Sequence, residues 1–157
     1  MIELSQLEVV KPHEVSVGTL LIGDAHYSDP PMFLFSFQDQ TWRFNLDDKG
    51  FEALPMVQNL HPYLTAGEPT LVVDVEEKVS PTRHNMPIGA VVFDGNKAGI
   101  AVRMNNGTVY VTLDGSVLDH PTSYERMVGF PRWRLVVPAF GPDEWHTVYE
   151  AGYEAEG

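Results

Sequence analysis

One short segment of the sequence holds the side chains most able to do chemistry. Residues 24–31 read Asp-Ala-His-Tyr-Ser-Asp-Pro-Pro and place one imidazole, one phenol and two carboxylates within six positions. Such groups can act as general acids and bases or bind a cation. Their spacing matches no metal-binding or catalytic-triad motif, and a polar loop closed by Asp-Pro-Pro turn chemistry would also account for them. The candidate site residues in this loop are Asp24, His26, Tyr27 and Asp29.

The segment 80–87, Ser-Pro-Thr-Arg-His-Asn-Met-Pro, contributes two further polar candidates. It carries Arg83 and His84 and, as a connection between two strand-rich regions, it needs no function of its own. A barrel would allow this segment and the 24–31 loop to lie at one rim. Arg83 and His84 therefore join the loop residues as one hypothetical site for a small molecule.

The motifs of common enzyme and cofactor sites are absent from the sequence. It has no Gly-x-Ser-x-Gly or Ser-x-x-Lys nucleophile, no Gly-x-Gly-x-x-Gly or Walker A phosphate loop, and no His-Glu-x-x-His zinc motif. The lack of cysteine excludes disulfides, thiol catalysis and Cys-ligated metals. We predict no catalytic residue, no metal and no cofactor, so the sequence favours a non-enzymatic function.

The composition is that of a folded, strongly acidic protein. The chain has 157 residues, of which 43% are hydrophobic and 20% charged, and this predicts a single domain spanning residues 1–157. Ten Lys and Arg against 22 Asp and Glu give a net charge of −12. Direct nucleic-acid binding is disfavoured, because it needs a basic surface. No apolar stretch approaches the roughly 18 residues of a membrane span, and residues 1–5 lack the basic start of a secretory signal. We expect no membrane partner and a cytoplasmic location.

The acidic residues are concentrated in the first half of the chain. Residues 1–78 hold 13 acids and 4 bases, a net charge of −9, whereas residues 79–157 hold 9 acids and 6 bases, a net charge of −3. The segment 143–157 contains five acids and no Lys or Arg, which predicts an acidic C-terminal tail. Solubility through self-repulsion is the simpler explanation. The functional one is attraction of a basic partner, with Asp47 and Asp48 as acidic interface candidates.

Two segments show the alternation of β-hairpins with one apolar face. In residues 100–113, a turn at Asn106-Gly107 pairs Met104 with Val109 and Val102 with Val111. A turn at Asp39-Gln40, 67 positions earlier, gives the same pattern in residues 33–46. Its apolar face is a stripe of aromatic residues that we assign to the core, namely Phe33, Phe35, Phe37, Trp42 and Phe44.

The similarity continues on both sides of the hairpins and predicts an internal repeat. Val17–Asp24 resembles Ile88–Gly95, and each region later returns to a Leu-Val-Val segment. We predict repeat units at about 17–76 and 88–138.

Strands separated by dense turn residues predict the fold class. Proline and glycine punctuate the chain and leave no room for long helices, so we expect only short helical turns, at 50–60 and 122–128. Further strands are expected within 4–10 and 145–150. The predicted fold is all-β, with two similar four-strand meander units packed as a sandwich or closed barrel and one or two short helical turns in the connections.

The segment Phe-Pro-Arg-Trp-Arg at 130–134 has the residue types that protein interfaces favour. Trp and Arg dominate interface hot spots because they bury large areas and make directed hydrogen bonds, so Arg132, Trp133 and Arg134 are interface candidates. In the alternative interpretation, Trp133 belongs to the core and the two arginines lie on the wet face of a strand.

Three functions remain open from the sequence. The first is a non-enzymatic acidic domain of the inhibitor, immunity or adaptor type that binds a basic protein partner. The second is a small-molecule-binding protein or hydrolase with its site at the 24–31 loop. The third is a structural or assembly protein that forms a homo-oligomer through exposed strand edges.

Overall fold

The structure is a computed structural model that describes residues 1–24, 29–47, 50–58, 60–80, 88–118, 127–141 and 143–152. The regular elements of these residues are β-strands and three short 3-10 turns, η1 (Leu4–Gln6), η2 (Pro12–Glu14) and η3 (Val75–Glu77). The strands are β1 (Glu8–Val10), β2 (Leu20–Asp24), β3 (Met32–Phe37), β4 (Gln40–Asn45), β5 (Ala53–Pro55), β6 (Tyr63–Thr65), β7 (Thr70–Val73), β8 (Val91–Asp94), β9 (Lys97–Met104), β10 (Gly107–Val111), β11 (Met127–Phe130), β12 (Trp133–Pro138) and β13 (Trp145–Ala151).

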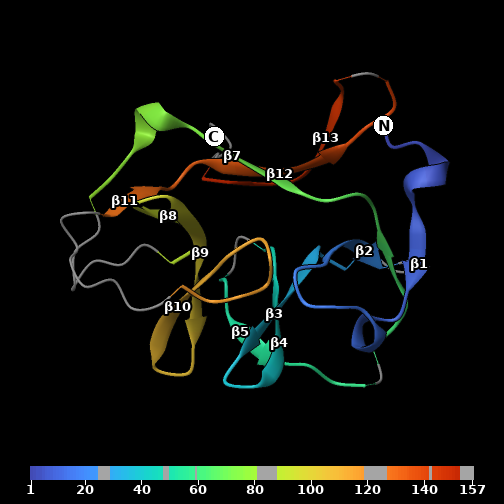
Figure 1. Ribbon diagram of the computed structural model, residues 1–157, viewed down its shortest axis with the longest axis horizontal. Helices are drawn as coiled ribbons and strands as arrows, with labels where there is room; N and C mark the ends of the chain where they lie inside the picture. Colours follow the sequence, from blue (N-terminus) through green and yellow to red (C-terminus); the bar gives the residue numbers. More distant parts are fainter. Residues whose placement is uncertain are drawn as a thin grey trace.

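The strands form three antiparallel sheets (Figure 1). The first has the order β1-β6-β2-β3-β4-β5, the second β10-β9-β8-β11 and the third β13-β12-β7. The predicted all-β fold class is thus confirmed, and its strands form several antiparallel sheets. The helical turn expected at 50–60 is wrong, because β5 pairs with β4 there. Of the other expected turn, residues 122–126 lie outside the described residues and Met127 already belongs to β11.

The predicted hairpins exist, but their registers are wrong by the same amount. Phe35 pairs with Trp42, and Val102 pairs with Val109, so both turns begin one residue earlier than predicted. The turn residues Gln38 and Asp39 have φ of 51° and 62°, and Asn105 has φ of 51°. Both registers keep the same side chains on the same face, so the apolar pattern could not distinguish them. The left-handed backbone of the turn residues decides the register instead.

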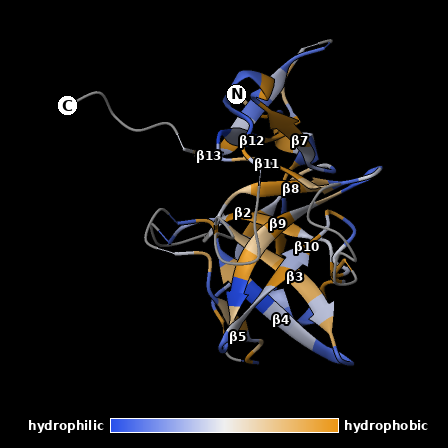
Figure 2. Ribbon diagram, turned by 90° about the vertical axis from the view of Figure 1, so that its left-hand side faces the viewer, coloured by the Kyte–Doolittle hydropathy of each residue, from blue (hydrophilic) through white to orange (hydrophobic). Residues whose placement is uncertain are grey.

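The apolar faces of the hairpins point into the main core. Three of the aromatic side chains are completely buried, namely Phe33, Phe35 and Phe44. The ring centroid of Phe44 lies 5.8 Å from that of Phe33 and 6.0 Å from that of Phe35. Phe37 and Trp42 are partly buried at the margin of the same cluster. Hydrophobic residues run along β3, β8 and β9 (Figure 2). Each fully buried Phe stabilises the fold by about 1.5–3 kcal/mol.

The third sheet joins the two halves of the chain. Strand β7 pairs with β12, with Leu71 opposite Leu135, and β13 pairs with the other edge of β12. The segment 145–151, part of the predicted acidic tail, is therefore a strand in this sheet. No helix in the described part of the chain is long and apolar enough to cross a membrane.

Candidate functional site

The loop site expected from the sequence falls mostly outside the described residues. His26, Tyr27, Arg83 and His84 lie there, as does the acidic interface candidate Asp48. Asp24 is the last residue of β2, and Asp29 is exposed at the start of the next described segment. The hypothetical small-molecule site therefore remains a prediction.

The Arg-Trp-Arg segment divides between the core and the surface. Trp133 is completely buried, and its indole Nε1 donates a 2.7 Å hydrogen bond to the carbonyl of Gly89. Its ring lies 5.9 Å from Phe51 and 5.6 Å from Tyr149 between centroids. Trp133 thus fills the interior, as in the core interpretation, and offers no surface to a partner.

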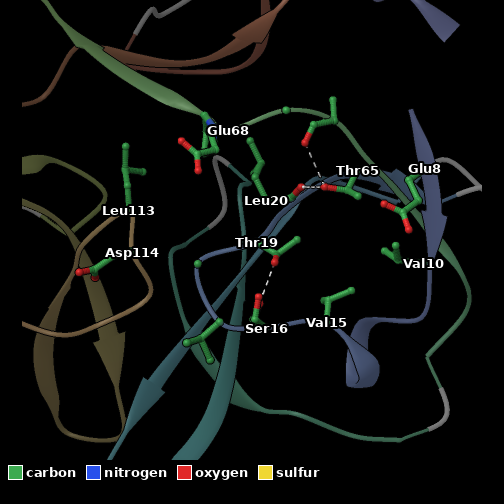
Figure 3. Close-up of a pocket in the computed structure, with 15 residues that line it drawn as sticks. Glu8, Val10, Val15, Ser16, Thr19, Leu20, Thr65, Glu68, Leu113 and Asp114 are labelled. Atoms are coloured by element: carbon green, nitrogen blue, oxygen red, sulfur yellow. Dashed lines mark hydrogen bonds between the residues drawn. The ribbon is translucent and has the colours of Figure 1, made fainter. Parts of the chain in front are cut away.

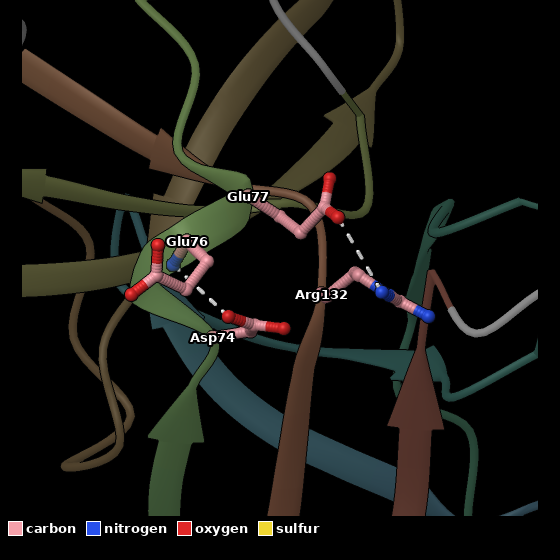
Figure 4. Close-up of polar contacts among 4 residues, drawn as sticks. All are labelled: Asp74, Glu76, Glu77 and Arg132. Carbon is pink, nitrogen blue, oxygen red and sulfur yellow. Dashed lines mark hydrogen bonds and ion pairs between the residues drawn. The ribbon is translucent and has the colours of Figure 1, made fainter.

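The two arginines that flank Trp133 are partly exposed. Arg132 lies beside Glu77 of η3, with 3.5 Å between Nη1 and Oε1 (Figure 4). The turn itself is capped by Asp74, whose carboxylate accepts a 3.0 Å hydrogen bond from the backbone of Glu76. The charge of Arg132 is therefore balanced locally by Glu77. Asp47, the remaining interface candidate, is partly buried.

A wide groove of about 750 Å³ opens at the edge of the first sheet (Figure 3). It is bounded by β1, the 15–20 segment, the 65–69 connection and the turn at 113–114. Two hydroxyl groups fix these walls: Thr65 Oγ1 donates to the carbonyl of Leu20 at 2.9 Å, and Thr19 Oγ1 donates to the carbonyl of Ser16 at 2.7 Å. The groove therefore has a framework of strand ends held by internal hydrogen bonds.

The groove is negatively charged. Glu8 and Glu68 approach it from different sides, and Asp114 lies at a third (Figure 3). No Lys, Arg or His is among its described lining residues. Within the described part of the chain, neither Glu8 nor Glu68 forms an ion pair. Three carboxylates without a cation among the lining residues attract positive charge.

Asp114 is held ionised by its own turn. Its Oδ1 accepts hydrogen bonds from the Ser116 hydroxyl at 2.6 Å, from the Thr112 hydroxyl, and from the Ser116 backbone at 2.9 Å. These bonds, those from the side chain of Ser116 foremost, lower the pKa of Asp114 from 3.8 to about 2. Asp114 is therefore ionised at neutral pH, at the margin of the groove.

The lining of the groove is mixed, and its apolar side chains form what we call the apolar wall. These are the side chains of Val10, Val15, Val17, Leu20 and Leu113. Such a mixture of apolar wall and charged rim suits a ligand that is itself amphipathic, with an apolar part to bury and a cationic part to pair.

The described lining of the groove carries carboxylates and hydroxyls but no imidazole or basic group. Of its three hydroxyl residues, Ser16, Thr19 and Thr65, the two threonines donate to backbone carbonyls, and no described lining residue is a histidine that would activate a hydroxyl. Among the residues that the structure describes, no group of three or more His, Asp or Glu side chains could hold a metal ion.

The uneven charge of the sequence is one indirect indication of this groove. All of its lining residues except Leu113 and Asp114 come from residues 8–69, within the strongly acidic first half. Glu8 and Glu68 are 60 positions apart in the sequence, and the pairing of β1 with β6, which ends three residues before Glu68, brings them to one groove.

Comparison with known proteins identifies no relative of this chain. No family model matches the chain, and neither a curated protein nor a solved structure matches it.

Proposed function

We propose that this protein is a non-enzymatic binding domain that recognises a basic segment of a protein partner in the groove of Glu8, Glu68 and Asp114. The observation that carries the proposal is the groove itself, with about 750 Å³ of space, acids on its rim and no basic residue among its described lining residues. A Lys or Arg side chain can place its aliphatic stem on the apolar wall and its charge beside the acids.

The charge of the whole chain supports the same proposal. A net charge of −12 creates a long-range field that accelerates the approach of a positively charged partner. The same charge makes two copies of the chain repel each other. A basic partner therefore fits the electrostatics better than a homo-oligomer.

An NMR titration tests the proposal directly. The amidated peptide acetyl-Lys-Arg-Ala-Arg-Lys should shift the backbone amide signals of Gly18, Thr65 and Gly67, whereas a peptide with Glu at the four basic positions should not. Because exposed ion pairs contribute about 0.5–1 kcal/mol each, Glu8→Gln with Glu68→Gln should weaken binding about five- to thirtyfold. Raising the salt concentration should also weaken it.

A matched double variant separates the groove from overall charge. Glu76→Gln with Glu144→Gln removes the same charge from two exposed acids that do not line the groove. It should reduce affinity by less than about twofold. Equal losses in the two double variants, or shifts confined to residues away from the groove, would contradict the proposal.

A further inference from the structure

The first and second sheets have matching parts at nearly constant spacing in the sequence. The order β6-β2-β3-β4 in the first sheet corresponds to β11-β8-β9-β10 in the second. The registers correspond as well, since Phe33 pairs with Phe44 and, 67 positions later, Ile100 pairs with Val111. The turns η1 and η3, 71 positions apart, come before the two sets of strands.

Two backbone hydrogen bonds connect these halves reciprocally. The Ser36 amide donates to the carbonyl of Gly115 at 2.7 Å, and the Arg103 amide donates to the carbonyl of Phe51 at 2.6 Å. Ser36 and Arg103 hold equivalent places in β3 and β9, and Phe51 and Gly115 each follow the second strand of their hairpin. Each set of strands thus donates an equivalent hydrogen bond to the other, as two copies related by a two-fold axis do.

A pair of glycines marks equivalent points in the two halves. Gly18 has φ of 85° and donates to the carbonyl of Leu34 at 2.8 Å, while Gly89 has φ of 86° and donates to that of Ala101 at 2.8 Å. The two glycines therefore share the same φ and an equivalent backbone hydrogen bond, so they differ mainly in the side chains around them.

At Gly89 the space is filled by aromatic side chains. The Phe51 ring lies so close that a Cβ on Gly89 would be 2.7 Å from it, and Trp133 donates its indole N–H to the Gly89 carbonyl. We call Phe51 and Trp133 the aromatic plug. Both are buried, with exposed fractions of 6% and 0%.

At Gly18 the equivalent positions carry small residues. Pro69 and Ala66 take the places, 64 positions earlier in the sequence, of Trp133 and Phe130. In place of the Phe51 ring, the backbone of Asp114 and Gly115 packs against Gly18, where a Cβ would lie 2.7 Å from the Asp114 carbonyl oxygen. Gly18, Pro69 and Ala66 all line the groove. Within the described residues, no donor reaches the Gly18 carbonyl, whereas that of Gly89 accepts the indole hydrogen bond. The groove thus lies where the counterpart of the Trp133 indole is missing.

We infer that the groove takes an aromatic side chain of the partner, a tryptophan flanked by Lys or Arg, as an external counterpart of Trp133. This inference rests on the proposed function and specifies its ligand. The ring would cover the apolar wall and its N–H would meet the Gly18 carbonyl. The flanking cations would meet Glu8 and Glu68.

The chain itself contains a model for such a ligand. Trp133 is flanked by Arg132 and Arg134, and this Arg-Trp-Arg segment fills the equivalent place in the other half. The residue equivalent to Arg132 is Glu68, so the charge is reversed at the groove. The groove is therefore complementary in both shape and charge to a segment of the type that the second half supplies internally.

Two peptides and two groove variants test the inference. Acetyl-Lys-Arg-Trp-Arg-Lys-amide should bind the full-length protein at least tenfold more tightly than the alanine peptide described above, by calorimetry at fixed salt. Ala66→Phe and, separately, Pro69→Trp place a ring in the groove and should abolish this difference. Thermal unfolding checks that each variant folds. If one of the two variants fails to fold, the other still tests the inference. Glu8→Gln with Glu68→Gln should weaken both peptides equally.

The outcomes distinguish this inference from the proposed function. A tenfold preference for the tryptophan peptide that disappears in a folded filling variant, together with shifts at Gly18, supports the inference. Equal affinity for the two peptides overturns it and leaves recognition of basic segments standing. A preference that persists in both filling variants also overturns it. Binding of neither peptide overturns the proposed function as well.

Discussion

The surroundings of Gly89 and Gly18 differ although their backbones agree. Around Gly89, Phe51 and Trp133 are buried and Arg132 pairs with Glu77, so space and charge are both satisfied within the chain. Around Gly18, small residues leave a groove whose acids have no basic neighbour among the described lining residues. The size of the side chains at a few positions therefore decides whether similar backbones enclose a packed core or leave an open groove.

Removing the aromatic plug should have the largest effect. Trp133→Ala deletes a completely buried indole and its hydrogen bond to Gly89, so we expect the free energy of unfolding to fall by about 3–5 kcal/mol. Urea denaturation measures this loss. Trp145→Ala is the matched control, because Trp145 is 52% exposed, and it should cost about 1 kcal/mol or less. Similar losses for the two variants would contradict the assignment of Trp133 to the core.

A methyl group at the close approach of the two halves should have the next largest effect. Gly115 has φ of 86°, and a Cβ there would collide with the backbone nitrogen of Gly18, so Gly115→Ala should cost about 2–3 kcal/mol. The control is Gly107→Ala, whose Cβ would lie 3.8 Å from the Met104 carbonyl in ordinary contact, and which should change stability by about 0.5 kcal/mol or less. Thermal or urea unfolding compares the two variants. A stable Gly115→Ala protein would show that this approach is looser than described.

Asp114 should give the smallest effect and a dependence on pH. Its pKa is about 2 in the folded protein, below the ordinary 3.8, so its ionised form stabilises the fold. That contribution is complete above about pH 4 and is lost as the pH falls towards 2. Because Asp114 is exposed, it amounts to about 1 kcal/mol or less. Asp114→Asn should lose it at neutral pH and flatten the stability profile between pH 4 and 2. Thr112→Val should raise the pKa seen by NMR, and an unchanged pKa would contradict the proposed cause.

The sequence predicts the all-β fold and the faces of its hairpins because alternation of apolar residues is a local property. It misplaces both turns, since Phe35 keeps its inward face whether it pairs with Phe44 or with Trp42. The groove could not be predicted in this way. Glu8, Glu68 and Asp114 lie far apart in the chain, and their proximity depends on strand order and on the contact between Gly18 and Gly115.

The pairing of β7 with β12 has a consequence for synthesis of the chain. The described partner of strand β7 is β12, which lies more than 60 residues further along the chain, and Leu71 pairs with Leu135. The emerging first half therefore carries an unpaired strand until β12 has left the ribosome. At about 5–20 residues per second, that exposure lasts several seconds, a period in which a nascent chain is open to wrong strand pairing and to chaperones.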